Sequence, residues 1–535
     1  MREFLDSIGY DSWVLLALLV IPALAAMGIW VHGAMLGDND ARDRASGTPR
    51  QIALWAFIIE FVVSLGLWWS YDPSTAAMQA TLDLTWIPSW GVRFALGIDG
   101  ISLMMVLLTT FLMPLAVLGS WTSIRIKRHS YYALLLLLTT GMLGVFVARD
   151  LFLFYVMWEM MLVPMYFIIG IWGGERRIYA TMKFFIYTMV GSLLMLVAIV
   201  YLGIKAGGGT GPNFAYDAVQ RMAGSGGMTS LFGAMVPASF LMFFAFALAF
   251  AIKVPMFPFH TWLPDAHVEA PTAGSVILAG IMLKMGTYGF LRFALPFFPD
   301  AAMHPAIRTT FLVLGTVGVL YGALVAMVQP DFKKLVAYSS VSHLGFVMLG
   351  IFALTTQSIQ GALMIMINHG ISTGALFLLI GMIYERRHTR ELAAYGGIAR
   401  VVPLFAALLT FVSLSSIGLP GTNGFVGEFL VLLGSFQTAP YLATFATMGV
   451  IFAAAYLLWA IQRIIFNRLD RAENEHIPDL NARELALMLP LVAVILWLGI
   501  YPAPVLRRME ASAQQLVTQV SGVAPAANVA SAGNP

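Results

Sequence analysis

The sequence contains no cysteine and has few charged residues. Of its 535 residues, 11% are charged and 59% are hydrophobic, against about 25% charged and roughly 45–50% apolar in an ordinary soluble domain. This composition excludes a water-soluble globular protein. The absence of cysteine excludes disulfides, thiolate nucleophiles, iron–sulfur ligation and zinc–sulfur sites, so any redox centre that this protein serves lies in another chain. The net charge of +3 is too small and too dispersed to indicate a nucleic-acid partner.

Long apolar runs make up most of the chain. A membrane-spanning helix needs about 20 mostly apolar residues, and we find about fourteen such runs. They are too long for the strands of a barrel, so the sequence predicts an all-α polytopic membrane protein surrounded by lipids. Their approximate limits are 13–33, 51–70, 100–120, 131–148, 150–171, 178–204, 236–262, 273–297, 308–328, 334–354, 357–383, 401–434, 440–466 and 486–506.

Basic residues gather in alternate connections between these runs. The positive-inside rule assigns the connections that hold them to the cytoplasm, and an even number of spans then leaves both termini on the opposite side. Eighteen of the 30 basic residues lie there: Arg42, Arg44, Arg50, Arg125, Lys127, Arg128, Arg176, Arg177, Lys333, Lys334, Arg386, Arg387, Arg390, Arg400, Arg463, Arg468, Arg471 and Arg483.

Two lysines lie inside apolar runs, where an ionisable side chain costs about 2.5–3.5 kcal/mol on insertion scales. Lys253 is followed by Pro255 and Pro258, which remove helix hydrogen bonds and break or kink the seventh run beside the charge. A broken helix at membrane depth is tolerated where it lines a polar cavity or is buried in protein. The lysine and the break therefore predict one water-accessible site. Lys284 lies at the middle of the eighth run.

Four further ionisable residues lie deep within runs five, ten, eleven and twelve, respectively Glu159, His343, His369 and Glu428. Glu428 follows a second predicted helix break, which contains Pro420, Gly421 and Gly424. Taken singly, Glu159 has the alternative of a structural carboxylate bound to a hydroxyl. Each histidine has the alternative of a helix-packing role.

Weaker candidates lie near the ends of runs. Lys183 is nearer the cytoplasmic end of the sixth run, and Asp265 and His267 belong to a short segment that suits either a metal or, more often, the capping of helix ends. We expect Arg292, near the end of the eighth run, to snorkel to the interface. Glu60 in the second run is either a packing carboxylate or part of the same functional path as the ionisable residues named above.

The order of these residues indicates two repeats. Broken helices with a charge recur in runs seven and twelve, and buried ionisable residues recur in runs five and ten. Runs four to eight and nine to thirteen thus form two five-helix repeats of inverted topology, as in secondary transporters. We divide the chain into the first three helices with a β-hairpin predicted by alternation in 81–96, the two repeats, and the last helix with a C-terminal tail, at residues 1–130, 131–300, 301–470 and 471–535.

These side chains suit proton transfer. A desolvated lysine loses its proton more easily, and a nearby carboxylate reverses that shift. Movement of Glu159 relative to Lys253 would switch the lysine between holding and releasing a proton. Lys253, Lys284, the histidines and Glu428 would then form a relay with water between them. The residues by themselves predict carriage of protons or other cations; an inert membrane scaffold is the alternative of a different class.

Three stretches resemble the antiporter-like subunits of respiratory complex I and the related cation/proton antiporters. They are His260–Ser275, Lys334–His343 and Gly418–Phe429. The resemblance covers residues 100–470. The glutamate rather than lysine at position 428, with Asn368–Ser372 and Tyr384–Arg390, is similar to one particular chain of that complex.

The resemblance implies a proton-translocating subunit driven by quinone reduction elsewhere in a complex. It implies Glu159 and Lys253 as a coupling ion pair, Lys284 as the central relay lysine, the two histidines as links and Glu428 as the terminal group. NADH, FMN, iron–sulfur clusters and quinone are expected in partner chains, with no cofactor or metal in this one. Expected partners are other complex I membrane subunits, especially chains L and N, in a bacterial inner (plasma) membrane with periplasmic termini. The alternative is a sodium/proton antiporter subunit.

Overall fold

Apolar helices form nearly all of the described chain. The structure is a computed structural model, and it describes residues 1–36, 47–209, 211–223, 228–231 and 234–522. Of the basic residues assigned to the cytoplasmic connections, Arg42 and Arg44 lie outside the described residues. Among the described residues, twelve helical segments are long and apolar enough to cross a membrane. This confirms the predicted all-α polytopic membrane fold.

The elements follow the predicted runs closely. The N-terminal part contains α1 (Arg2–Ser7), α2 (Tyr10–Leu36), α4 (Thr48–Ser70), β1 (Gln79–Ile87), β2 (Val92–Ile98) and α5 (Gly100–Gly119). Next come α6 (Arg128–Val147), α7 (Leu151–Met160), α8 (Leu162–Trp172), α9 (Arg177–Ala206), α10 (Tyr216–Ala223), β3 (Met228–Leu231), β4 (Ala234–Pro237), α11 (Ala238–Lys253) and α12 (Trp262–Glu269). One long segment then joins α13 (Thr272–Ile277), α14 (Leu283–Gly289) and α15 (Leu295–Phe297) through the π-helical stretches Leu278–Met282 and Phe290–Ala294.

The remaining elements are α16 (Pro299–Met303), α17 (Pro305–Met327), α18 (Phe332–Ala353), α19 (Thr356–Arg387), α20 (Pro403–Ile417), α21 (Asn423–Phe436), α22 (Pro440–Ile461), α23 (Ala482–Ile500) and α24 (Ala503–Ser521). The shorter apolar helices α11, α20 and α21 belong to two interrupted segments, α11–α12 and α20–α21. If each interrupted segment crosses the membrane once, these two crossings and the twelve long helical segments together equal the predicted fourteen membrane spans. The number of crossings and the five-helix repeats stay predictions.

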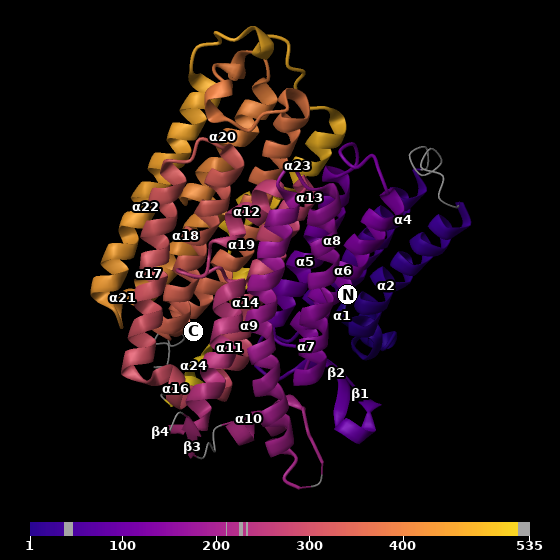
Figure 1. Cartoon of the computed structure of the whole chain (residues 1–535), viewed down its shortest axis with the longest axis vertical. Coiled ribbons are helices and arrows are strands. Elements are labelled where there is room, and N and C mark those ends of the chain that lie inside the picture. Colours follow the sequence, from indigo (N-terminus) through magenta and orange to yellow (C-terminus); the bar gives the residue numbers. More distant parts are fainter. Residues whose placement is uncertain (37–46, 210, 224–227, 232–233, 523–535) are drawn as a thin grey trace, which may run out of the picture.

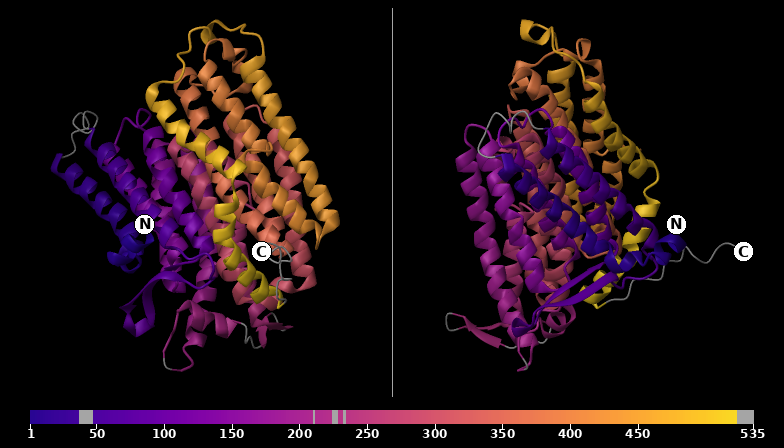
Figure 2. Two further views of the ribbon diagram at one scale, coloured as in Figure 1. Left: turned by 180° about the vertical axis from the view of Figure 1, so that it is seen from behind. Right: turned by 90° about the vertical axis from the view of Figure 1, so that its right-hand side faces the viewer.

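The helices run side by side in one elongated bundle (Figures 1 and 2). Helices α2 and α4 lie on one side of the bundle, at the right of Figure 1, α21 and α22 lie on the opposite side, and α11, α14 and α19 lie between them. The β1–β2 hairpin, α10 and β3–β4 project together from one face of the bundle, at the bottom of Figure 1. We call this the hairpin side.

The hairpin is present where the residue alternation predicts it. Strands β1 and β2 pair antiparallel, with Leu82 opposite Leu96 and Thr85 opposite Arg93. The Asp150 side chain caps α7 by accepting hydrogen bonds from the amides of Phe152 and Leu153, at 2.9 and 3.0 Å. Its other oxygen accepts from the Arg93 amide of β2 at 3.1 Å, which ties the hairpin to the start of the helix that carries Glu159.

Candidate functional site

The first helix break lies where the two prolines predict it. Helix α11 ends at Lys253, and α12 begins at Trp262, so Pro255 and Pro258 both lie in the connection. The connection satisfies carbonyls that the break leaves free: the Trp262 indole donates to the Ile252 carbonyl at 2.9 Å. The break is therefore a built part of the fold, buried in protein as a membrane interior requires.

Lys253 is buried beside aromatic rings. Its Nζ lies 5.6 Å from the ring centre of Trp158 and 5.5 Å from that of Phe184, within the range of cation–π attraction. Glu159, the neighbour of Trp158 on α7, is close enough to Lys253 to interact electrostatically. Among the described residues no ion pair within 4 Å joins Glu159 to Lys253, and Glu159 Oε1 is buried without a hydrogen-bond partner. The predicted partners are therefore neighbours that stand apart in this conformation.

Lys284 and His369 are in direct contact. Lys284 is fully buried on α14, its Nζ lies 2.7 Å from His369 Nδ1 on α19, and it also donates to the Ala279 carbonyl. Gly370 allows this approach, because a Cβ there would stand 2.9 Å from the Gly280 carbonyl oxygen. The absence of a side chain at Gly370 therefore lets α19 approach the Gly280 backbone and brings the lysine and the histidine within hydrogen-bond distance.

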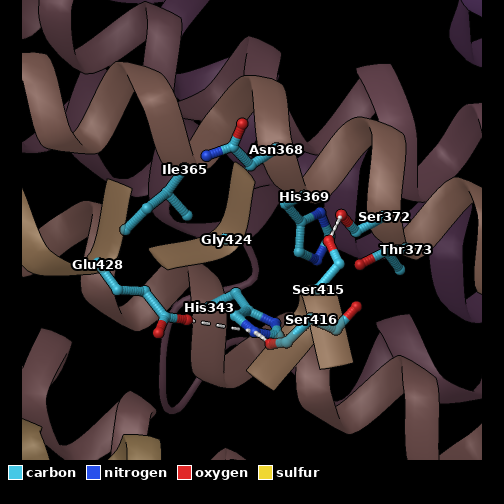
Figure 3. A pocket seen from close by; sticks show the side chains of 10 residues that line it. All are labelled: His343, Ile365, Asn368, His369, Ser372, Thr373, Ser415, Ser416, Gly424 and Glu428. Atoms are coloured by element: carbon cyan, nitrogen blue, oxygen red, sulfur yellow. Dashed lines mark hydrogen bonds and ion pairs between the residues drawn. The ribbon is translucent and has the colours of Figure 1, made fainter. Parts of the chain in front are cut away.

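The line of ionisable groups continues from His369 to Glu428. The rings of His369 and His343 lie 5.5 Å apart between centres, and His343 Nε2 lies 3.6 Å from Glu428 Oε1 and 3.1 Å from the Ser416 carbonyl oxygen. These side chains surround a cavity of about 20 Å³ (Figure 3). A cavity needs about 10–15 Å³ to hold one water, so a single water fits here. Asn368 Oδ1 and Ser416 Oγ, which also line it, have no hydrogen-bond partner among the described residues.

The second break separates α20 from α21. Helix α20 ends at Ile417, followed by Gly418 and Gly421 with φ of +86° and +91°, and Pro420 lies between them. These left-handed conformations favour glycine. The prediction is wrong for Gly424, which is the second residue of α21 and lies past the break. Its role is close packing, since a Cβ there would stand 2.0 Å from the Ser415 carbonyl oxygen.

The weaker candidates separate into two groups. Lys183 and Asp265 pair with each other at 2.8 Å. His267 instead joins the line of ionisable groups: it is fully buried, interacts electrostatically with Lys284 and His369, and stacks on Phe377 at 4.8 Å between ring centres.

The segment around His267 does not cap α12, for which no side-chain cap is present. Glu269 instead accepts from the Arg176 amide at the start of α9, at 3.0 Å. The described residues contain no group of three or more His, Asp or Glu side chains that would hold a metal.

Arg292 contradicts the sequence expectation. It is 8% exposed and does not snorkel; its Nη2 lies 2.5 Å from Asp99 Oδ1. Asp99 lies in the connection before α5, so its proximity to Arg292 is not apparent from the local sequence. Glu60 lies on α4, which contacts α2, α5 and α6. It is therefore placed away from the residues on α11, α14 and α19, and both its carboxylate oxygens are without hydrogen-bond partners within the described part of the chain.

Sequence reasoning missed a set of neutral polar residues at the second break. Asn423 Oδ1 accepts from Ser415 Oγ at 2.6 Å and from Ser372 Oγ at 3.2 Å, and the Asn423 carbonyl accepts from Asn368 Nδ2 at 2.5 Å. These bonds join α19, α20 and α21 beside His369. The available signal was the position of Asn368 directly before His369 and of Asn423 between Gly421 and Gly424, two residues of the predicted break.

Sequence reasoning also placed Lys333 in a cytoplasmic connection, whereas the structure buries it. Its Nζ donates to the Ala270 carbonyl at 2.6 Å. Lys333 and Phe377 line a cavity of about 410 Å³ at the face of the bundle opposite the hairpin. Because His267 stacks on Phe377, this cavity reaches the neighbourhood of the ionisable line.

Comparisons with known proteins agree with this arrangement. Residues 148–454 match the family described as NADH:quinone oxidoreductase/Mrp antiporter. The chain is 46% identical to NADH-quinone oxidoreductase subunit M of Rhodobacter capsulatus, over 94% of this chain and 96% of that protein. It is 42% identical to NADH-ubiquinone oxidoreductase chain 4 of Chondrus crispus, over 88% of this chain and 93% of that protein.

Solved structures give the same result. A chain of respiratory complex I from Thermus thermophilus matches with a TM-score of 0.82 at 32% identity, over 95% of this chain and 99% of that chain. A chain of the Mrp complex from Dietzia sp. DQ12-45-1b matches with a TM-score of 0.75 at 22% identity, over 94% of this chain and 52% of that chain, which shows a shared fold. The chain therefore belongs to the NADH:quinone oxidoreductase/Mrp antiporter family, and within it to the subunit M (chain 4) group of NADH:quinone oxidoreductases.

Proposed function

We propose that this chain carries protons across the membrane as a subunit of NADH:quinone oxidoreductase, driven by quinone reduction in other chains. The observation that carries the proposal is the succession of buried groups from Lys284 through His369 and His343 to Glu428, beside a cavity with room for one water. Its successive separations are 2.7 Å, 5.5 Å between ring centres and 3.6 Å. Buried ionisable groups are costly in a membrane unless they serve a path or a pair, and four of them in sequence support a path.

Lys253 and Glu159 act as the switch at the start of this path. The cation–π contacts hold the lysine while the carboxylate stands apart. Approach of Glu159 stabilises the charged lysine, and its withdrawal favours release of the proton. His267, between Lys284 and the 410 Å³ cavity, links the path to the face opposite the hairpin side.

The rest of the assignment follows from this role. The relay comprises Glu159, Lys253, Lys284, His343, His369 and Glu428, with residues 131–300 and 301–470 as the two repeats. NADH, FMN, iron–sulfur clusters and quinone belong to partner chains, and chains L and N are the expected neighbours. The membrane is the bacterial inner membrane, with the termini and the hairpin side on its periplasmic face.

The test is proton pumping by inverted membrane vesicles, followed by a pH-sensitive dye, with NADH oxidation and assembly measured in parallel. Lys253→Ala, Glu159→Ala and Lys284→Ala are expected to lose most pumping while the complex assembles. Lys205→Ala, at an exposed lysine in the last turn of α9, is the control and is expected to pump normally. Wild-type pumping by the first three variants would refute the relay.

A second comparison tests the charge of Glu159. Because charge tunes Lys253, Glu159→Asp is expected to retain more pumping than Glu159→Gln. Equal losses would contradict the pair.

The sodium/proton antiporter is separated by a different measurement. A tagged chain is purified in mild detergent and run on a native gel stained for NADH oxidation. Co-migration with a very large NADH-oxidising band supports the oxidoreductase subunit. Migration away from that band, with sodium-dependent proton exchange, would support the antiporter.

A further inference from the structure

The cavity of about 410 Å³ opens toward the solution on the face opposite the hairpin side. Its wall includes the exposed residues Ser123, Arg125 and His388. Lys333 and Glu385 also line it, so charged groups surround much of the space. A cavity with polar walls accepts water, and one water takes up about 30 Å³. Several waters from the solution therefore have room to enter the bundle here.

The Phe377 ring covers the inner end of this cavity. Phe377 lies on α19, is 1% exposed and forms part of the cavity wall. Its ring stacks on His267 of α12, with 4.8 Å between ring centres and 14° between ring planes. His267 is fully buried and is not one of the residues that form the wall. One aromatic ring therefore separates the imidazole from the space that water can enter.

The imidazole behind this ring lacks hydrogen-bond partners. Neither Nδ1 nor Nε2 of His267 has a partner among the described residues. A neutral imidazole offers one donor and one acceptor, and a buried polar group without a partner is costly. The face of the Phe377 ring is apolar and supplies no strong partner. Water from the cavity would supply both a donor and an acceptor, so the histidine favours the entry of water once the ring moves aside.

His267 is also a neighbour of the ionisable line. It interacts electrostatically with Lys284 and His369, which are themselves in contact at 2.7 Å. A permanent water connection to His267 would let protons on this line return to the solution from which they came. A transporter prevents such return by opening its site to one side at a time. An apolar constriction that excludes water is one way to close a side.

The Phe377 ring has space in which to move. The cavity adjoins it, and Gly381, one turn later on α19, lines the same wall without a side chain. A change of the Phe377 χ1 rotamer therefore carries the ring into the cavity, where it displaces water and no helix has to move. The closed position keeps the stacking contact with His267, whereas the open position gives the imidazole a water partner. These two gains oppose each other, as a gate with two accessible states requires.

We propose that Phe377 is a gate between the solution and the proton path. In the closed state its ring keeps water from His267, and the histidine exchanges protons with the buried line alone. Rotation of the ring admits water from the cavity, and the histidine then takes up a proton from the solution. Closure leaves that proton with access only to Lys284 and His369. This inference rests on the proposed function, in which His267 links the path to this face.

The gate is tested by the access of a reagent to position 267 in the purified complex, in mild detergent. The chain has no natural cysteine, so His267→Cys introduces a single thiol, and its reaction with a small charged thiol reagent is detected as a mass shift of this chain. With Phe377 in place, labelling is expected to be slow. Adding Phe377→Ala is expected to raise the labelling rate about tenfold, because loss of one stacking ring shifts an open–closed equilibrium by about that factor.

Two controls accompany this measurement. Ile380→Ala is the matched control, because Ile380 is buried, lines the same cavity and lies about one turn from Phe377 on α19. Combined with His267→Cys, it is expected to leave labelling slow, whereas Ser123→Cys on the exposed wall is expected to label fast. Phe377→Val removes the ring but keeps an apolar side chain, and it serves if Phe377→Ala prevents assembly. Equal labelling rates of His267→Cys with and without loss of the ring would overturn the gate.

Proton pumping separates this inference from the proposed function. With His267 unchanged, Phe377→Ala is expected to lower the number of protons pumped per NADH oxidised, because protons return through the open gate, and Ile380→Ala is expected to keep it. An unchanged ratio in Phe377→Ala would also overturn the gate. Normal pumping by Lys284→Ala would instead refute the proposed function. The labelling rate depends on the Phe377 ring alone, so it decides on the gate whatever Lys284→Ala shows.

Discussion

Replacing Gly370 by alanine tests the contact on which the proposed relay depends, that between Lys284 and His369. A Cβ at position 370 would stand 2.9 Å from the Gly280 carbonyl oxygen and 3.0 Å from Leu108 Cδ2. The leucine methyl can move, but the carbonyl belongs to the backbone of the segment that carries Lys284. The substitution is therefore expected to push α19 away from that segment.

The size of the displacement follows from the geometry. Ordinary van der Waals contact begins near 3.4 Å, so the two segments separate by about 0.5 Å. The 2.7 Å contact between Lys284 and His369 lengthens to about 3.2 Å, the outer limit of a good hydrogen bond. Overpacking of this kind costs about 1–3 kcal/mol. Because a 1 Å misplacement costs on the order of 100-fold in rate, half of it costs on the order of tenfold.

The assay is NADH-driven pumping by membrane vesicles at matched levels of assembled complex. The control is Gly374→Ala, one turn later in α19, where a Cβ would meet Val276 Cγ1 at 3.6 Å and strain nothing. Gly370→Ala is expected to lose most of its pumping, while Gly374→Ala keeps it. Equal pumping by the two variants would refute the reasoning that the glycine contact sets the relay distance.

Two further substitutions test the second break and the hairpin attachment. Gly418→Ala is expected to lower the stability of the purified complex in thermal unfolding by about 1–2 kcal/mol, because an alanine is strained in the left-handed backbone conformation of this residue. It is also expected to lower pumping, because the alanine Cβ would stand 2.8 Å from Glu428 Oε2 and displace that carboxylate. Gly421→Ala, with a similar φ and nothing within 4 Å, should lose stability but keep pumping; equal pumping losses would count against the displacement of Glu428. Asp150→Ala removes the α7 cap and should cost about 0.5–2 kcal/mol in the thermal unfolding of the complex, whereas Asp150→Asn keeps most of the cap; similar losses in both would contradict the capping role.

Much of the set of buried ionisable groups was predictable because membranes penalise charge. The apolar runs set the helices, and the rarity of ionisable groups inside them identified Lys253, Lys284 and Glu428 without any contact being known. The prolines after Lys253 determined the first break, since proline lacks the amide that continues a helix. The glycines and proline after Ile417 did the same for the second break.

Other features depended on residues distant in sequence. Arg292 was expected to snorkel because its own helix offers no partner, yet Asp99 lies 2.5 Å away in the fold. Lys183 and Asp265 pair with each other, and His267 stacks on Phe377 from α19. Gly424 was assigned to the break by its residue type, although its function is close contact with Ser415. Local sequence holds no information on which side chain from another helix fills the space nearby.

The sequence by itself determined that this protein is a bundle of membrane helices with buried ionisable groups and two breaks, because burial in lipid and the backbone chemistry of proline and glycine act locally. Only the tertiary structure decided which of those groups meet. Contact between Lys284 and His369 requires two helices to approach at Gly280 and Gly370, and the distance between helices depends on side chains from both of them.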